Sequence, residues 1–73
     1  MLSNDKFLHN LGKRIEELYI KKYKNQSDFA VACEVDTRTI RRIIKSEQNP
    51  TILVLRRIAI ALDIELKELI DIE

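Results

Sequence analysis

Residues 25–45 read NQSDFAVACEVDTRTIRRIIK, and this stretch decides the fold. Asn25 and Asp36 are residue types that are favoured at the N-cap of a helix. Each is followed by apolar residues at helical spacing, which are Phe29, Ala30, Ala32 and Cys33 in the first case and Ile40, Ile43 and Ile44 in the second. Because only residues 34–35 separate the two segments, the stretch predicts two short helices joined by a very tight turn, the second over Thr37–Lys45.

Three further helices are predicted around this pair. The first of them carries apolar residues three and four apart, namely Phe7, Leu8, Leu11, Ile15, Leu18 and Tyr19. Gly12 lies inside this helix and is expected to be only a minor cost. Pro50 closes a loop, Thr51 caps the next helix, and a short last helix begins at about Glu65. No stretch has the alternation of a strand, so the sequence predicts an all-α fold, a compact five-helix domain over residues 1–73.

The composition indicates one domain that folds without a disulfide or a metal. The chain has 73 residues, of which 45% are hydrophobic, with one glycine and one proline. The single cysteine, Cys33, has no partner for a disulfide, and with the single His9 it offers no pattern for a metal site. We therefore expect no metal and no cofactor, and we interpret Cys33 as a small buried hydrophobe.

Catalytic and targeting patterns are not evident in the sequence. No Ser/His/Asp triad or pair of catalytic carboxylates can be assembled, which predicts that the chain is not an enzyme and has no small-molecule substrate. No apolar run approaches the length that spans a bilayer, and the N-terminus lacks the basic-then-apolar order of a signal peptide. We expect a cytoplasmic protein that has no membrane partner.

The charge is distributed unevenly along the chain. The net charge is only +1, but residues 1–45 carry ten Lys and Arg against six Asp and Glu, whereas residues 46–73 carry three against six. A basic half and an acidic half favour one face that binds an anion and another face that binds something else.

The helix predicted over Thr37–Lys45 offers a basic outer face. With its isoleucines in the core, spacings of three and four leave five polar side chains on the solvent side, which are Thr37, Arg38, Arg41, Arg42 and Lys45. Arginine can pair with guanine O6 and N7, which contributes about 1–3 kcal/mol of discrimination per contact. The alternative is that this stripe is simply a solvated helix face.

From Leu11 to Ile70 the sequence resembles the phage-repressor-like (Cro/C1, or XRE) helix-turn-helix family. The matching residues are Arg14-Ile15, residues 25–30, Val35-Asp36, Ile40, Arg42-Ile43, Asn49-Pro50-Thr51, Leu55, Ile58-Ala59, Ala61-Leu62 and Glu68-Leu69. All of these pieces occur in order and at the spacing of the family. The resemblance implies a lambda-repressor-like fold that binds double-stranded DNA.

The resemblance also implies individual roles. Residues that would read bases are Thr37, Arg38 and Arg42. Residues that would contact the DNA backbone are Asn25, Gln26, Ser27, Thr39, Arg41, Lys45, Asn49 and Thr51. Gln26 matches the family glutamine that contacts phosphate and braces the recognition helix.

Among the positions that depart from the family pattern, three lie in turns. Glu34 stands where the family usually has glycine in the turn, and a left-handed conformation there would cost a non-glycine residue about 1 kcal/mol. Tyr23 and Ser46 also occupy positions where glycine is frequent, which predicts that both turns are longer or differently shaped.

The C-terminal run is more apolar than one side of a short helix requires. It either closes the core or forms a surface for self-association. Because relatives dimerise through their last helix, we expect a homodimer with Ile64, Leu66, Ile70 and Ile72 in its interface.

Two functions follow from these observations. The first is a sequence-specific DNA-binding transcriptional regulator, which inserts the helix of residues 37–45 into the major groove of a two-fold operator. The alternative, which the acidic half supports, is a protein-interaction module of the same fold, antitoxin-like or a partner-binding subunit, that binds little DNA. Steep salt dependence would distinguish the first from the second.

Overall fold

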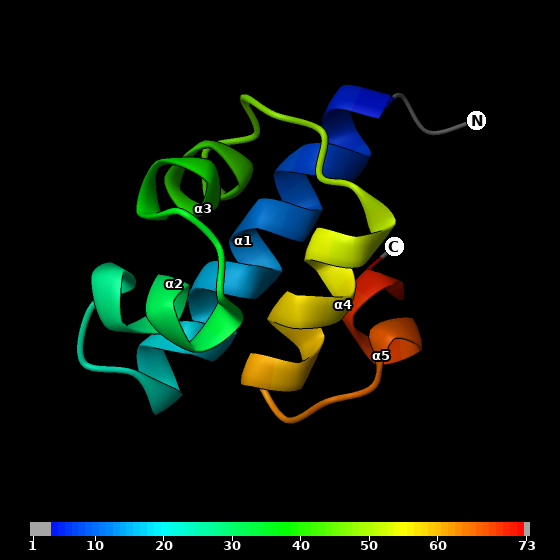
Figure 1. Cartoon of the computed structure of the whole chain (residues 1–73). Helices are drawn as coiled ribbons and strands as arrows, with labels where there is room; N and C mark the ends of the chain where they lie inside the picture. Colours follow the sequence, from blue (N-terminus) through cyan, green and yellow to red (C-terminus); the bar gives the residue numbers. More distant parts are fainter. Residues whose placement is uncertain (1–3, 73) are drawn as a thin grey trace.

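The computed structural model describes residues 4–72, and within them it contains five helices and no strand (Figure 1). The helices are α1 (Asn4–Lys22), α2 (Gln26–Cys33), α3 (Thr37–Ile44), α4 (Ile52–Ala61) and α5 (Leu66–Ile70). The predicted all-α, five-helix architecture is therefore confirmed. One boundary differs, because α3 ends at Ile44, and Lys45 is its C-cap residue rather than part of the helix.

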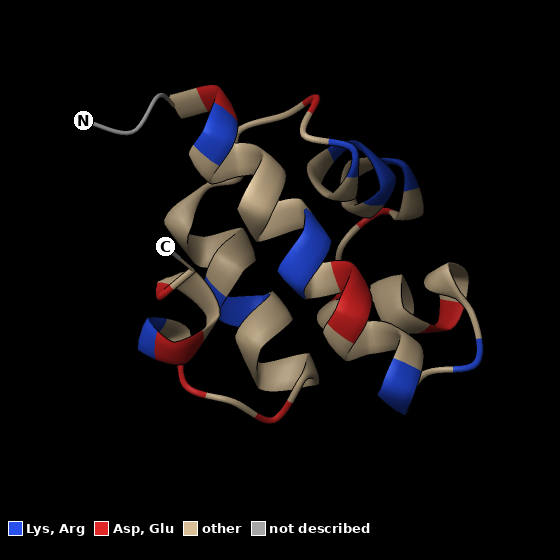
Figure 2. Ribbon diagram, turned by 180° about the vertical axis from the view of Figure 1, so that it is seen from behind, with Lys and Arg blue, Asp and Glu red and all other residues tan. Residues whose placement is uncertain are grey.

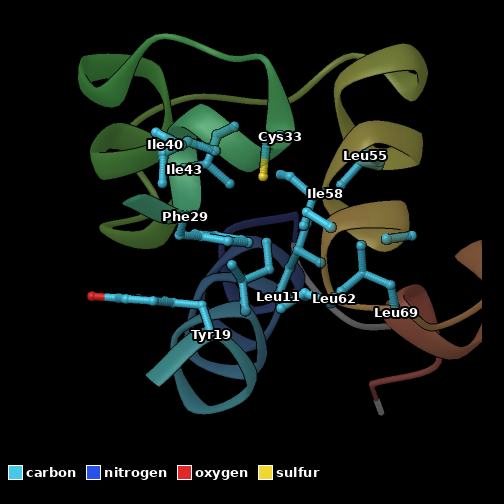
Figure 3. Close-up of a cluster of buried hydrophobic side chains, with 14 residues drawn as sticks. Leu11, Tyr19, Phe29, Cys33, Ile40, Ile43, Leu55, Ile58, Leu62 and Leu69 are labelled. Carbon is cyan, nitrogen blue, oxygen red and sulfur yellow. The ribbon is translucent and has the colours of Figure 1, made fainter. Parts of the chain in front are cut away.

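A single hydrophobic core holds the helices together (Figure 3). Every helix contributes to it: Leu11 from α1, Phe29 from α2, Ile40 from α3, Ile58 from α4 and Leu69 from α5 are at most 1% exposed. The Phe29 ring stacks on Tyr19 at a centroid distance of 4.9 Å, which joins α2 to α1. Offset stacking of this kind adds about 0.5–1.5 kcal/mol beyond the burial of the two rings.

Side-chain caps fix where two of the helices begin. Asn25 Oδ1 accepts a hydrogen bond from the backbone N–H of Asp28 at 2.8 Å, and Thr51 Oγ1 accepts one from the N–H of Val54 at 3.1 Å. Both caps are as predicted. Asp36 stands at the N-cap of α3, but its side chain makes no capping hydrogen bond, so the predicted cap there is wrong.

Three helices end in the same backbone turn, each with a non-glycine residue in the left-handed region. These residues are Glu34 (φ 58°) after α2, Ser46 (φ 64°) after α3 and Asp63 (φ 60°) after α4. After α2, the N–H of Glu34 donates to the carbonyl of Val31 and the N–H of Val35 to that of Ala30, which is the Schellman pattern. Glu34 thus takes the left-handed conformation expected of it. Ser46 adopts the conformation of the glycine it replaces, so the predicted change of turn shape does not occur there.

Side chains that follow α1 and α3 hold distant segments together. The Tyr23 hydroxyl donates to the carbonyl of Ala61 at 2.6 Å, which ties the end of α1 to the end of α4. The Ser46 hydroxyl donates to the carbonyl of Leu8 at 3.1 Å and ties the end of α3 to α1. Both residues therefore replace the frequent glycine with a side chain that links two helices.

Gly12 lies where α1 packs closely against the end of α3. A Cβ atom added there would meet the carbonyl oxygen of Ile44, and it would lie 2.9 Å from that of Ile43. These are backbone atoms, which cannot rotate away. The expectation that Gly12 is only a minor cost is therefore wrong, because the absence of a side chain lets the end of α3 pack directly on α1.

Cys33 is buried on the inner face of α2, as predicted. Burial disfavours the thiolate and raises the pKa of Cys33 to about 12. The thiol is thus neutral at physiological pH and packs as an apolar side chain. Among the described residues, no helix combines the length and the apolar character that crossing a membrane requires.

We predict that Gly12→Ala destabilises the protein by about 1–2 kcal/mol. Alanine favours a helix by about 1 kcal/mol over glycine, but forcing a methyl group against backbone carbonyls costs more than that. Urea unfolding followed by circular dichroism measures the difference. Lys13→Ala, at the exposed neighbouring position, is the control and should change stability by less than about 0.5 kcal/mol. A Gly12→Ala protein as stable as the wild type would contradict the proposed close packing.

We also predict that Glu34→Gly stabilises the protein by about 0.5–1 kcal/mol. Glycine relieves the left-handed strain, and its greater freedom in the unfolded chain offsets part of the gain. Glu34→Ala removes the same carboxylate while keeping Cβ, so thermal unfolding should show no stabilisation for it. Equal melting temperatures for the two variants would argue against backbone strain at this residue.

Candidate nucleic-acid interface

Helix α3 divides into a buried apolar face and an exposed basic face. Ile40 and Ile43 are buried in the core, whereas Arg38, Arg41 and Arg42 are exposed. No acidic residue occurs in α3, and Figure 2 shows several basic residues along it. The sequence prediction of a basic outer face is therefore confirmed.

Arg38 and Arg42 lie furthest from the core on this face. They are four residues apart, so their side chains leave the helix in nearly the same direction, opposite the isoleucines. Lys45 is exposed just beyond the helix end, and Thr37 and Thr39 are half-buried along the flanks. The surface thus combines fork-shaped guanidinium donors at its centre with shorter hydroxyl donors at its edges.

The position of α3 is fixed by its neighbours. Its C-terminal end rests on Gly12 and is tied to α1 through the Ser46 hydroxyl. Its N-terminal end follows the tight turn at Glu34, whose carbonyl accepts a hydrogen bond from the Arg57 guanidinium at 3.3 Å. A basic helix held at both ends can present its side chains in one orientation, as recognition of a groove requires.

The N-terminus of α2 supplies a second group of polar atoms. Asn25 and Ser27 are exposed, and Gln26 is half-buried. The oxygen of the Asn25 side chain is occupied by its cap, which leaves its amide NH₂ free to donate outward. Within the first turn the N–H of Asp28 is taken by the Asn25 cap, and the preceding N–H groups give the helix a positive end that suits a phosphate.

Asn49 and Thr51 lie in the segment that joins α3 to α4, and both are exposed. Figure 1 shows this segment leaving the end of α3 and passing across the top of the molecule. The two residues are therefore beyond the basic helix and not on it. Thr51 also caps α4, so its hydroxyl oxygen is already used by the backbone of Val54.

The residues predicted for a dimer interface are mostly committed to the core. Ile64, Leu66 and Ile72 are half-buried and pack against the core cluster, and Ile70 is 36% exposed. The more exposed large apolar side chains lie on other helices and are Ile20, Val31, Ile52, Leu53 and Ile60. Sequence reasoning missed them, although the three on α4 fall outside the buried stripe formed by Leu55, Ile58, Ala59 and Leu62.

Comparison with known proteins gives two similarities. A helix-turn-helix family profile matches residues 15–69. Among solved structures, the restriction-modification controller protein C.AhdI from Aeromonas hydrophila is similar with a TM-score of 0.81 and 29% sequence identity, over 85% of this chain and 94% of that one. No curated protein sequence matches the chain. The family match includes the whole of α2, α3 and α4, and so contains the basic helix and the turn before it.

We predict that Arg41→Ala weakens DNA binding uniformly across sequences. Loss of one phosphate contact should lower the slope of log affinity against log salt by about 1. The measurement is fluorescence anisotropy on a labelled duplex at several salt concentrations. Lys67→Ala removes an equal charge on α5 and should leave the slope unchanged. Identical slopes for the two variants would mean that the exposed face of α3 does not lie on the phosphates.

Proposed function

The chain belongs to the helix-turn-helix family of the Cro/C1 (XRE) type, and we propose that α3 is the helix with which it enters the major groove of DNA. The protein is a DNA-binding transcriptional regulator. The observation that carries the proposal is the exposed basic face of α3, centred on Arg38 and Arg42. An α-helix fits the width of the major groove, and its N-terminal residues reach the base edges.

Arg38 and Arg42 are proposed to read bases together with Thr37. Each guanidinium can donate two parallel hydrogen bonds to guanine O6 and N7, while the threonine can use its hydroxyl or its methyl group. The charges also attract the duplex before docking, which raises the association rate.

A second set of residues is proposed to hold the DNA backbone. The set consists of Asn25, Gln26, Ser27, Thr39, Arg41, Lys45, Asn49 and Thr51. The positive end of α2 and the side chains beside it would bind one phosphate, and the segment between α3 and α4 would reach another. Contacts of this kind fix the register of α3 in the groove without reading sequence.

We further propose that the regulator acts as a homodimer on a two-fold operator. Two recognition helices related by a two-fold axis would meet half-sites about 34–36 Å apart. The proposed interface consists of Ile70 and the partly exposed edges of Ile64, Leu66 and Ile72.

The similarity to a restriction-modification controller protein supports restriction-modification genes as the genes that this regulator controls. We also propose that the protein acts in the cytoplasm, which its single thiol, Cys33, supports, and that it has no catalytic activity of its own.

The acidic C-terminal half favours a second candidate, a protein-interaction module with little DNA binding. Residues 46–73 carry twice as many acidic as basic side chains. The binding affinity depends differently on salt under the two candidate functions. Binding to DNA weakens steeply as counterions are added, whereas an apolar protein interface hardly responds.

We predict that Arg38→Ala loses about 1–3 kcal/mol of affinity for the preferred duplex, because a bidentate base contact is removed. The duplex is first enriched from a random library with the wild-type protein, and binding is then measured by anisotropy at two salt concentrations. Arg38→Lys is the matched control: it keeps the charge but lacks the fork, so it should retain non-specific binding and lose specificity. Failure to enrich any sequence, with equal weak binding by all three proteins, would favour the protein-interaction module.

A further inference from the structure

A surface formed by α2 and α4 combines exposed apolar side chains with arginine. On α4, Leu53, Arg56, Arg57 and Ile60 are spaced as i, i+3, i+4 and i+7, so they share one face of the helix. Leu53 and Ile60 are 65% and 62% exposed. A shallow pocket of about 210 Å³ connects this face to Ala32 at the end of α2. We call these five residues the α2–α4 face.

The charge of the α2–α4 face is positive. Arg56 and Arg57 are the only charged residues of α4, and both lie between the exposed Leu53 and Ile60. The Arg57 guanidinium donates to the backbone carbonyl of Glu34, which holds it beside the pocket. Glu34 contributes one carboxylate at the pocket rim, so one positive charge is left over. An apolar surface with a net positive centre is complementary to an apolar surface that carries acidic residues.

Two other occupants fit this face poorly. A second copy docked through the same face on a two-fold axis would bring the arginines of the two copies toward each other, and like charges repel. The α5 helix of a second copy is a poor occupant as well, because its Leu69 is fully buried in its own core and its exposed Ile70 is assigned to the proposed dimer interface. A DNA phosphate would pair with Arg56 but would leave Leu53 and Ile60 exposed to water.

We propose that the α2–α4 face binds an acidic amphipathic helix of a partner protein. The apolar residues of that helix would cover Leu53 and Ile60, and its carboxylates would pair with Arg56 and Arg57. Residues spaced along two turns of α4 are the length that a docked helix covers with its own i, i+4 and i+7 positions. The α2–α4 face shares no residue with the proposed DNA contacts, so the regulator can hold DNA and this partner together.

The test uses a synthetic helical peptide that carries leucines at i, i+3, i+4 and i+7 with glutamates between them. Binding of the labelled peptide to the full chain is measured by anisotropy, and the site is mapped by amide chemical shifts. A second peptide, in which every glutamate is replaced by lysine, is the control with reversed charge. The variants are Arg56→Glu and Ile60→Ser, and the control is Ile20→Ser, which removes an exposed isoleucine of α1 outside the face.

We expect the acidic peptide to bind the wild type and to shift the amides of α2 and α4. Arg56→Glu should weaken it roughly tenfold or more and should strengthen the lysine peptide, because the charge complementarity is reversed. Ile60→Ser should weaken both peptides, and Ile20→Ser neither. DNA affinity should be the same in all four proteins.

Several outcomes would overturn the proposal. The acidic peptide does not bind the wild type, or it binds equally well to Arg56→Glu and Ile60→Ser. Self-association that sedimentation detects in the wild type and not in Ile60→Ser would assign the face to a second copy. Loss of DNA affinity in Arg56→Glu would assign it to the DNA backbone. Each of these leaves the proposed role of α3 intact, since that role is tested separately with Arg38.

Discussion

The structure depends on burying one side of an eight-residue helix whose other side is basic. Helix α3 is too short to be stable alone, so its position comes from packing Ile40 and Ile43 into the core. Packing requires that the end of α3 approach the backbone of α1, and Gly12 permits this approach. The exposure of Arg38 and Arg42 is thus set by the burial of Ile40 and Ile43 on the opposite side of the helix.

Much of this arrangement could be predicted from the sequence because it is encoded locally. Helical spacing identified the inner face of α3, and the caps Asn25 and Thr51 were read from residue type. The left-handed Glu34 was expected from the family resemblance, because the family usually has glycine at this position. The packing role of Gly12 was not predicted. The spacing of apolar residues within a helix does not show where its backbone will lie close to another helix. The C-terminal apolar residues were ambiguous for a similar reason, because periodicity does not distinguish a side chain that closes its own core from one that meets another chain.

The distribution of charge acquires a structural meaning once the helices are assembled. The basic residues of the first half include those gathered on the outside of α3, while the acidic second half still contains two arginines on the outer side of α4. Two separate positive surfaces, one hydrophilic and one bordered by leucine and isoleucine, suit different ligands. The net charge of the chain alone does not reveal either of these positive surfaces.

The aromatic side chains have a practical consequence. Tyr19 stacks on Phe29, Tyr23 is tilted against the same ring and donates its hydroxyl to a backbone carbonyl, and the chain has no tryptophan. Both tyrosine chromophores therefore sit where α1 and α2 join the core, and no indole emission covers theirs. Tyrosine fluorescence and near-ultraviolet absorption in unlabelled protein will report on the assembly of this junction.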